Sequence, residues 1–226
     1  MLFDRFKDVS NDYGLFIEQL VRFNKVKTCV EIGVAFGTTT HYLCKAVHDA
    51  QTEGTVYGYD VWAQHGVIKR CGQLSSKKEV DNYLRSEGHT NFILEQVNTT
   101  TPEFKNMIGK IGPIDFAFID GCHSYGGIKN DFDIVYPLLS DHGMIMFHDT
   151  CVIDGCREFV IDLRDKYYNG EYDIVDFPYG GHRRFGLALL VKRSFSHGVL
   201  IDEICGSESS PQEIYKKESD WINSKK

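Results

Sequence analysis

The segment from Val30 to Thr38, which reads VEIGVAFGT, constrains the fold of this chain more than any other. An apolar run ends in Glu31, and two glycines, Gly33 and Gly37, follow it. This order predicts a strand, a tight turn and the start of a helix at Thr38, because glycine lets the backbone turn sharply. The turn lacks the G-x-G-x-x-G spacing of dinucleotide-binding dehydrogenases. We therefore expect another nucleotide-like cofactor here, facing the N-terminus of the helix.

Composition is typical of a soluble globular protein of one domain, with 226 residues, 42% hydrophobic and 25% charged. No apolar run approaches the roughly 20 residues of a membrane span, and the N-terminus does not resemble a signal peptide. The seven cysteines form no C-x-x-C pair, which favours reduced thiols and a cytoplasmic location without membrane contact. The net charge of -7 argues against a nucleic-acid partner.

Helical and strand-like patterns alternate along the chain, which predicts an α/β protein. The expected architecture is a Rossmann-like sheet of seven, mostly parallel strands with helices on both faces. The expected strands span residues 27–33, 55–60, 92–97, 114–120, 143–149, 172–177 and 185–191. The expected helices span residues 11–23, 38–47, 77–85, 125–139 and 155–168. We divide the chain into an N-terminal helical segment (1–26), a cofactor-binding domain (27–193) and a polar C-terminal extension (194–226), expected to be mobile.

Two polar residues end the strands that should lie beside the glycine turn. Asp60 closes the second predicted strand, about as far along the chain as the acid that binds ribose hydroxyls in doubly wound sheets. Asn98 follows the third predicted strand, where it can meet the adenine edge of a cofactor. The alternative for Asn98 is a residue that only forms a turn before three threonines.

A second group of polar residues follows two strongly apolar strands. Asp120 ends one and Asp149 ends the other, and both carboxylates should therefore meet at the ligand-binding edge of the sheet. Adjacent carboxylates repel each other unless a cation or proton lies between them, which predicts a site for Mg²⁺ or another divalent cation. His123 lies on the same loop as Asp120 and suits a general base. The alternative is that both aspartates only cap the helices that follow them.

These motifs resemble a known family. The pattern E-x-G-x-x-x-G resembles the cofactor motif of class I S-adenosylmethionine-dependent methyltransferases. The run I-D-G-x-H-S-Y, followed later by F-H-D, resembles the branch with cephalosporin-hydroxylase-like and metal-dependent sugar O-methyltransferases. The resemblance implies that Glu31, Gly33, Gly37, Thr38, Asp60, Asn98 and Asp120 bind S-adenosylmethionine.

In that branch, the acid that matches Asp120 and two adjacent acids after a later strand bind magnesium, and the histidine that matches His123 serves some members as the base. Asp120, Asp149 and His123 match these positions, whereas His148 replaces the first acid of the adjacent pair. The resemblance therefore implies Asp120, Asp149 and His148 as metal ligands, with Asp120 and His123 as catalytic residues. The histidine also allows manganese, iron or no metal at all.

The expected function is O-methylation of a sugar or another small hydroxylated molecule. The first part of the segment from Trp62 to Gly88 and the loop from Tyr179 to Arg184 should shape the acceptor pocket. Two other classes stay open: a non-catalytic cofactor-binding protein on this fold, and an oxidative enzyme with a 2-His-1-carboxylate metal site. A homo-oligomer also stays open, because the N-terminal helix and the C-terminal extension could each pack on a partner.

Overall fold

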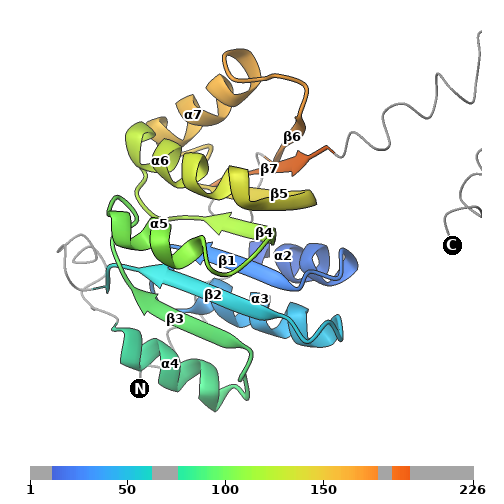
Figure 1. Ribbon diagram of the computed structural model, residues 1–226, viewed down its shortest axis with the longest axis vertical. Helices are drawn as coiled ribbons and strands as arrows, with labels where there is room; N and C mark the ends of the chain where they lie inside the picture. The colour runs from blue at the N-terminus through green and yellow to red at the C-terminus, as the bar shows by residue number, and fades with distance from the viewer. Residues whose placement is uncertain (1–11, 63–75, 178–184, 194–226) are drawn as a thin grey trace, which may run out of the picture. The chain divides into compact units, whose positions relative to one another are not determined.

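The computed structural model describes residues 12–62, 76–177 and 185–193. Seven strands form one sheet in the order β3-β2-β1-β4-β5-β7-β6 (Figure 1). The strands are β1 (Thr28–Ile32), β2 (Thr55–Asp60), β3 (Phe92–Gln96), β4 (Ile114–Ile119), β5 (Leu139–His148), β6 (Tyr172–Phe177) and β7 (Leu187–Lys192). Neighbouring strands from β3 to β5 pair in parallel, whereas β7 pairs antiparallel with both β5 and β6. The predicted seven-stranded, mostly parallel sheet is confirmed.

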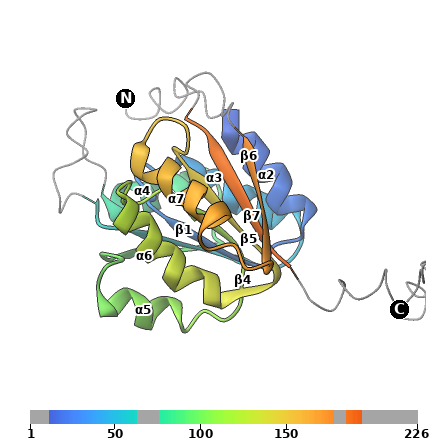
Figure 2. The same cartoon turned by 90° about the horizontal axis from the view of Figure 1, so that it is seen from above.

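Helices cover both faces of this sheet, as predicted (Figure 2). They are α2 (Asp12–Phe23), α3 (Thr38–Asp49), α4 (Lys77–Ser86), α5 (Pro102–Ile108), α6 (Tyr125–Val135) and α7 (Asp154–Asp165), with a short 3-10 helix η3 (Tyr136–Leu138). Strand β4 shows how the layers form, because successive side chains of a strand point to opposite faces. Phe116 and Phe118 pack in the core below α2, α3 and α4. Ala117 and Ile119 pack in the core below α5, α6 and α7.

The structure differs locally from the sequence-based expectation in three places, and two of these differences have simple physical causes. Helix α5 was not predicted, although Thr101 and Pro102 give it a cap position followed by a proline in its first turn. The helix predicted to run to Leu139 stops as an α-helix at Val135, because Pro137 has no amide hydrogen to continue it. Strand β5 begins at Leu139, earlier than expected, and its pairing with β4 contains a register shift.

The register of the parallel strands brings four candidate residues into one row. Ile32 of β1 pairs with Tyr59 of β2 and with Ile119 of β4, and Ile119 pairs in turn with Phe147 of β5. The residues that directly follow these four in the chain are Gly33, Asp60, Asp120 and His148. The carboxyl edge of the sheet, where ligands bind in open α/β folds, therefore carries most of the predicted site.

Three predicted features lie outside the described residues: the first part of the loop after Trp62 (residues 63–75), the loop at 178–184 and the C-terminal extension (194–226). The division into three segments stays a prediction. None of the described helices combines the length and the apolar character needed to cross a membrane.

Candidate functional site at the carboxyl edge of the sheet

The glycine turn brings the end of β1 against the end of β4. Gly33 has a φ of +91°, and a Cβ on this residue would lie 2.1 Å from the carbonyl oxygen of Asp120. The Gly33 amide donates to the carbonyl of Tyr59 at 2.9 Å, and the Asp120 amide donates to the carbonyl of Ile32 at 2.8 Å. Only glycine allows both this backbone conformation and this approach. The turn and the loop after β4 therefore form one continuous surface.

Asp60 holds the glycine turn through its backbone. One carboxylate oxygen accepts a hydrogen bond from the amide of Ala35 at 2.7 Å, and the other accepts from the amide of Trp62 at 2.5 Å. The indole of Trp62 donates to the carbonyl of Ala35 at 3.2 Å. Ala35 is thus held from both sides, and its φ of +48° is maintained by these contacts. The expected role of Asp60 in ribose binding stays a prediction.

Glu31 lies fully buried beneath the turn. One oxygen accepts a hydrogen bond from the Thr40 hydroxyl at 2.5 Å, and the other, Oε1, has no hydrogen-bond partner among the described residues. Burial raises the pKa of Glu31 well above its usual value, and the nearby carboxylates of Asp120 and Asp60 raise it further. An unpaired buried oxygen is costly. The geometry beneath the turn thus favours a ligand that brings positive charge or a hydrogen-bond donor.

The remaining predicted cofactor residues occupy the edge in two different ways. Helix α3 begins at Thr38 as expected, and Gly37, in a left-handed conformation, provides it with no side-chain cap. The Asn98 side chain accepts hydrogen bonds from the amide of Thr100 at 3.0 Å and from its hydroxyl at 2.8 Å. Asn98 therefore forms the local turn that was the alternative for it. Its contact with an adenine ring stays a prediction.

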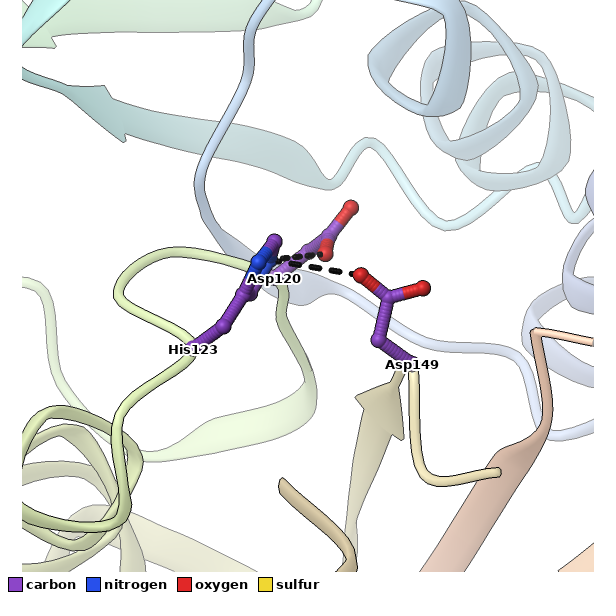
Figure 3. A group of neighbouring side chains, drawn as sticks. All are labelled: Asp120, His123 and Asp149. Carbon is purple, nitrogen blue, oxygen red and sulfur yellow. Dashed lines mark hydrogen bonds and ion pairs between the residues drawn. The ribbon is translucent and has the colours of Figure 1, made fainter. Parts of the chain in front are cut away.

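Asp120 and His123, which follow β4, meet Asp149, which follows β5, in one cluster (Figure 3). The Nε2 atom of His123 lies 3.2 Å from Asp120 Oδ1 and 3.5 Å from Asp149 Oδ2. His123 is also the most exposed of the four side chains, at 41%, compared with 22% for Asp120, 9% for Asp149 and 8% for His148. His123 is therefore the member of the cluster that an incoming molecule can reach most easily.

His148, the last residue of β5, is the fourth member of the cluster. Its Nδ1 atom lies 3.1 Å from Asp120 Oδ1 and 3.4 Å from Asp149 Oδ1. Its Nε2 atom and Asp149 Oδ1 are both buried without a hydrogen-bond partner in residues 12–62, 76–177 and 185–193. Asp149 itself has a φ of +60°, a conformation that costs a residue other than glycine about 1–3 kcal/mol. Such strain and unpaired polar atoms commonly mark a functional site.

Opposite charges shift the pKa values within this cluster. The hydrogen bond with Asp120, followed by the charges of Asp120 and Asp149, raises the pKa of His123. Burial alone would lower the pKa of His148, but Asp120 and Asp149 outweigh it and the net shift is upward. Burial would likewise raise the pKa of Asp120, but the two histidines outweigh it and the pKa falls. For Asp149, burial prevails and the pKa rises.

Three members of the cluster have the spacing of metal ligands. One ligand atom from each of Asp120, His123 and Asp149 can be chosen so that all three lie within 4.8 Å of one another. Two carboxylates and one imidazole are a suitable donor set for a divalent cation such as Mn²⁺ or Fe²⁺. His148, a predicted ligand, is not in this group, and His123, a predicted base, is. The predicted roles of the two histidines both stay predictions.

Sequence reasoning did not assign Tyr13, Thr40 or the indole of Trp62 to the site. The Trp62 side chain, whose indole holds the turn, is only 2% exposed and packs in the core. The sequence gives a weak indication that Thr40 belongs to the site, because Thr40 falls on the first turn of the helix that follows the glycine motif. The sequence gives no indication that Tyr13 belongs to the site, because only the docking of α2 brings it there.

Comparison with solved structures yields methyltransferases. The fold matches the O-methyltransferase TomG of Streptomyces achromogenes, solved with S-adenosylmethionine, with a TM-score of 0.66 and 15% identity over 82% of both chains. It also matches an O-methyltransferase of Bacillus cereus, solved with S-adenosylhomocysteine, with a TM-score of 0.61 and 17% identity. That match covers 82% of this chain and 83% of the other. At these identities, the likeness is one of fold.

Among curated proteins, the chain matches the uncharacterized protein y4gI of Sinorhizobium fredii, with 24% identity over 140 residues. The match covers 61% of this chain and 15% of that protein. This chain therefore corresponds to a small part of the length of the curated relative it matches.

The sequence profile of a family described as a methyltransferase domain matches residues 30–150. The match begins just before Glu31 and ends just after Asp149. It therefore includes the glycine turn and the acid–histidine cluster, which consists of Asp120, His123, His148 and Asp149. It covers more than half of the 226 residues. Together with the seven-stranded fold, this match shows that the chain belongs to the methyltransferase-domain family and confirms the resemblance to class I S-adenosylmethionine-dependent methyltransferases.

Proposed function

We propose that this protein transfers the methyl group of S-adenosylmethionine to a hydroxyl oxygen of a small molecule. The observation that carries the proposal is the direct contact between the two halves of the site. Gly33, in the cofactor turn, approaches the backbone of Asp120, whose side chain belongs to the cluster. A donor bound at the turn and an acceptor bound at His123 would therefore be neighbours, which is what in-line methyl transfer requires.

The charges around the turn suit a cationic donor. Glu31 and Asp120 have no ion pair with a lysine or arginine among the described residues, and the same is true of Asp60. Burial, followed by the nearby carboxylates of Asp120 and Asp60, raises the pKa of Glu31. S-adenosylmethionine carries a positive sulfonium and a positive ammonium group, and either one would relieve this repulsion.

His123 is the residue proposed to take the proton from the acceptor hydroxyl. It is the most exposed member of the cluster, and Asp120 orients it through the contact at 3.2 Å. A carboxylate beside an imidazole fixes its tautomer and stabilises the imidazolium that forms. A sugar or another polyhydroxy compound is the proposed acceptor class.

We propose a cation site as the alternative arrangement, in which Asp120, His123 and Asp149 hold a divalent cation and His123 is a ligand instead of the base. When bound, such a cation would lower the pKa of the acceptor hydroxyl. A histidine that ligates a cation through Nε2 cannot take a proton at the same atom. The two roles of His123 therefore make opposite predictions when the cation is removed.

The experiment begins with calorimetric titration of the protein with S-adenosylmethionine and S-adenosylhomocysteine, in EDTA, in Mg²⁺ and in Mn²⁺. Release of S-adenosylhomocysteine is then followed with a panel of sugars and phenols as acceptors. We expect micromolar binding of both nucleosides and turnover with a hydroxylated acceptor. Turnover that survives EDTA assigns His123 as the base, and turnover that needs a cation assigns it as a ligand. Absence of binding under all three conditions would refute the proposal and favour the non-catalytic or oxidative alternative.

A further inference from the structure

Helix α2, which precedes the family match, contributes an aromatic side chain to the site. Ile17 and Val21 of this helix are fully buried. Gly14 lets the helix approach α3 closely, because a Cβ at this position would lie 2.4 Å from the ring of Tyr42. This docking places Tyr13, the neighbour of Gly14, at the carboxyl edge of the sheet.

The ring of Tyr13 packs on His148. The two ring centroids are 4.8 Å apart with an angle of 47° between the rings. Phe118 of β4 and Phe185, just before β7, lie 5.9 Å and 5.6 Å from the same imidazole. Three aromatic rings from three separate parts of the chain thus surround His148.

This packing matters because His148 is weakly held by hydrogen bonds. Its Nδ1 atom contacts Asp120, but its Nε2 atom is buried without a partner in the part of the chain that the structure describes. The unpaired nitrogen of a buried imidazole makes no hydrogen bond that could fix the direction of the ring. The aromatic packing must therefore supply much of the restraint that keeps Nδ1 directed at the carboxylates.

We propose that Tyr13 is a positioning residue that holds His148, and through it Asp120, in the geometry the site needs; this rests on the function proposed above. Tyr13 acts through its ring, since the ring makes the contact with His148. Its hydroxyl is not the reacting group: burial, followed by the charge of Asp120, raises the pKa of Tyr13 above its usual value and keeps it protonated.

Four variants separate this role from simple support of the fold. Tyr13→Phe keeps the ring, Tyr13→Leu keeps apolar volume without an aromatic ring, and Tyr13→Ala removes both. Val21→Ala is the matched control, because it weakens the same helix at a fully buried position away from His148. All four are labelled with ¹⁵N-histidine, and the ring nitrogen signals of His148, assigned through His148→Gln, are compared with those of the wild type.

We expect the His148 signals of Tyr13→Phe and Val21→Ala to match the wild type, although Val21→Ala melts at a lower temperature. In Tyr13→Leu and Tyr13→Ala the signals should shift or broaden. With an acceptor in hand, kcat of these two variants should fall on the order of tenfold to a hundredfold, while the Kd for S-adenosylmethionine stays within about threefold of the wild type.

Unchanged His148 signals in both Tyr13→Leu and Tyr13→Ala would overturn the proposal. So would the same shift in Val21→Ala, because the effect would then come from the helix as a whole. These spectra need neither cofactor nor acceptor. Failure of the proposed function, seen as absent cofactor binding by the wild type, is therefore distinguishable from failure of the role of Tyr13.

Discussion

Two pairs of histidines in this protein have opposite tendencies to hold a proton. His41 of α3 and His89, after α4, join ring to ring, with His89 Nε2 lying 2.9 Å from His41 Nδ1. Burial lowers the pKa of both. His123 and His148 contact aspartates instead of each other, and their pKa values are raised.

The pKa values of the two pairs shift in opposite directions because their neighbouring residues differ. A hydrogen bond between two imidazoles needs at least one of them to be neutral, and burial favours that state. Carboxylates within 3.5 Å reverse the effect of burial in the second pair. Both members of the second pair contact Asp120, a carboxylate that can share a proton or a cation with them and whose backbone lies against Gly33 of the cofactor turn. Each of the following predictions tests this contrast.

We expect the largest effect on stability and cofactor binding from Gly33→Ala. This substitution would push the cofactor turn away from Asp120, which contacts the second pair of histidines. The new Cβ would meet the backbone of Asp120, and the residue would keep an unfavourable positive φ. We expect a loss of about 3–5 kcal/mol in the free energy of unfolding, measured with urea, together with loss of S-adenosylmethionine binding.

Gly88→Ala is the matched control for Gly33→Ala. Gly88 has a similar φ of +87°, but a Cβ there would meet nothing within 4 Å. It should cost only the backbone strain of about 1–2 kcal/mol and leave cofactor binding intact. Equal costs for the two variants would show that the approach of the turn to Asp120 is unimportant.

The next effect concerns catalysis by one member of each pair. We expect His123→Ala to reduce kcat by about a hundredfold or more, since a general base contributes this much. Binding of S-adenosylmethionine, measured by calorimetry, should survive. His89→Gln, in the other pair, should keep kcat near the wild-type value. A comparable loss of cofactor affinity in His123→Ala would contradict the assignment of a base.

A smaller effect is expected on cation affinity. His148→Gln should weaken Mn²⁺ binding about 10- to 100-fold, as the loss of a residue that orients a ligand typically does. Asp149→Asn, which removes a proposed ligand, should weaken it more. His89→Gln should leave the titration unchanged. If His148→Gln weakens Mn²⁺ binding more than Asp149→Asn does, His148 is itself a ligand, as the sequence resemblance implied.

The smallest effect is expected in the pH dependence of stability. Because the pKa values of His41 and His89 are lowered in the folded protein, the unfolded chain binds more protons below the usual histidine pKa. This pair should therefore destabilise the protein as pH falls through about 6.5 toward the lower folded pKa values. Urea unfolding of the wild type and of His89→Gln, compared from pH 5 to 8, isolates the contribution, because the second pair is common to both. An identical pH dependence would contradict it.

Much of the fold followed from local patterns in the sequence. The bounds of β2 and β6 were predicted to the residue, because short apolar or alternating runs between turn residues leave few choices. Helix α5 was missed because seven residues carry too little periodicity to stand out. The sequence predicted a mostly parallel sheet but did not identify β7 as the antiparallel strand, since pairing direction depends on distant partners.

The sequence by itself determined which residues could act. It placed Gly33, Asp60, Asp120 and Asp149 at strand ends, and parallel register then brings such ends to one edge. Only the tertiary structure decided which of them touch and in which direction their neighbours shift their pKa values. His123 and His148 share their residue type with His41 and His89, but the charge each pair favours depends on carboxylates that arrive from other strands. Tyr13 joins them only because α2 packs on α3, and a contact between distant segments leaves no local pattern in the sequence.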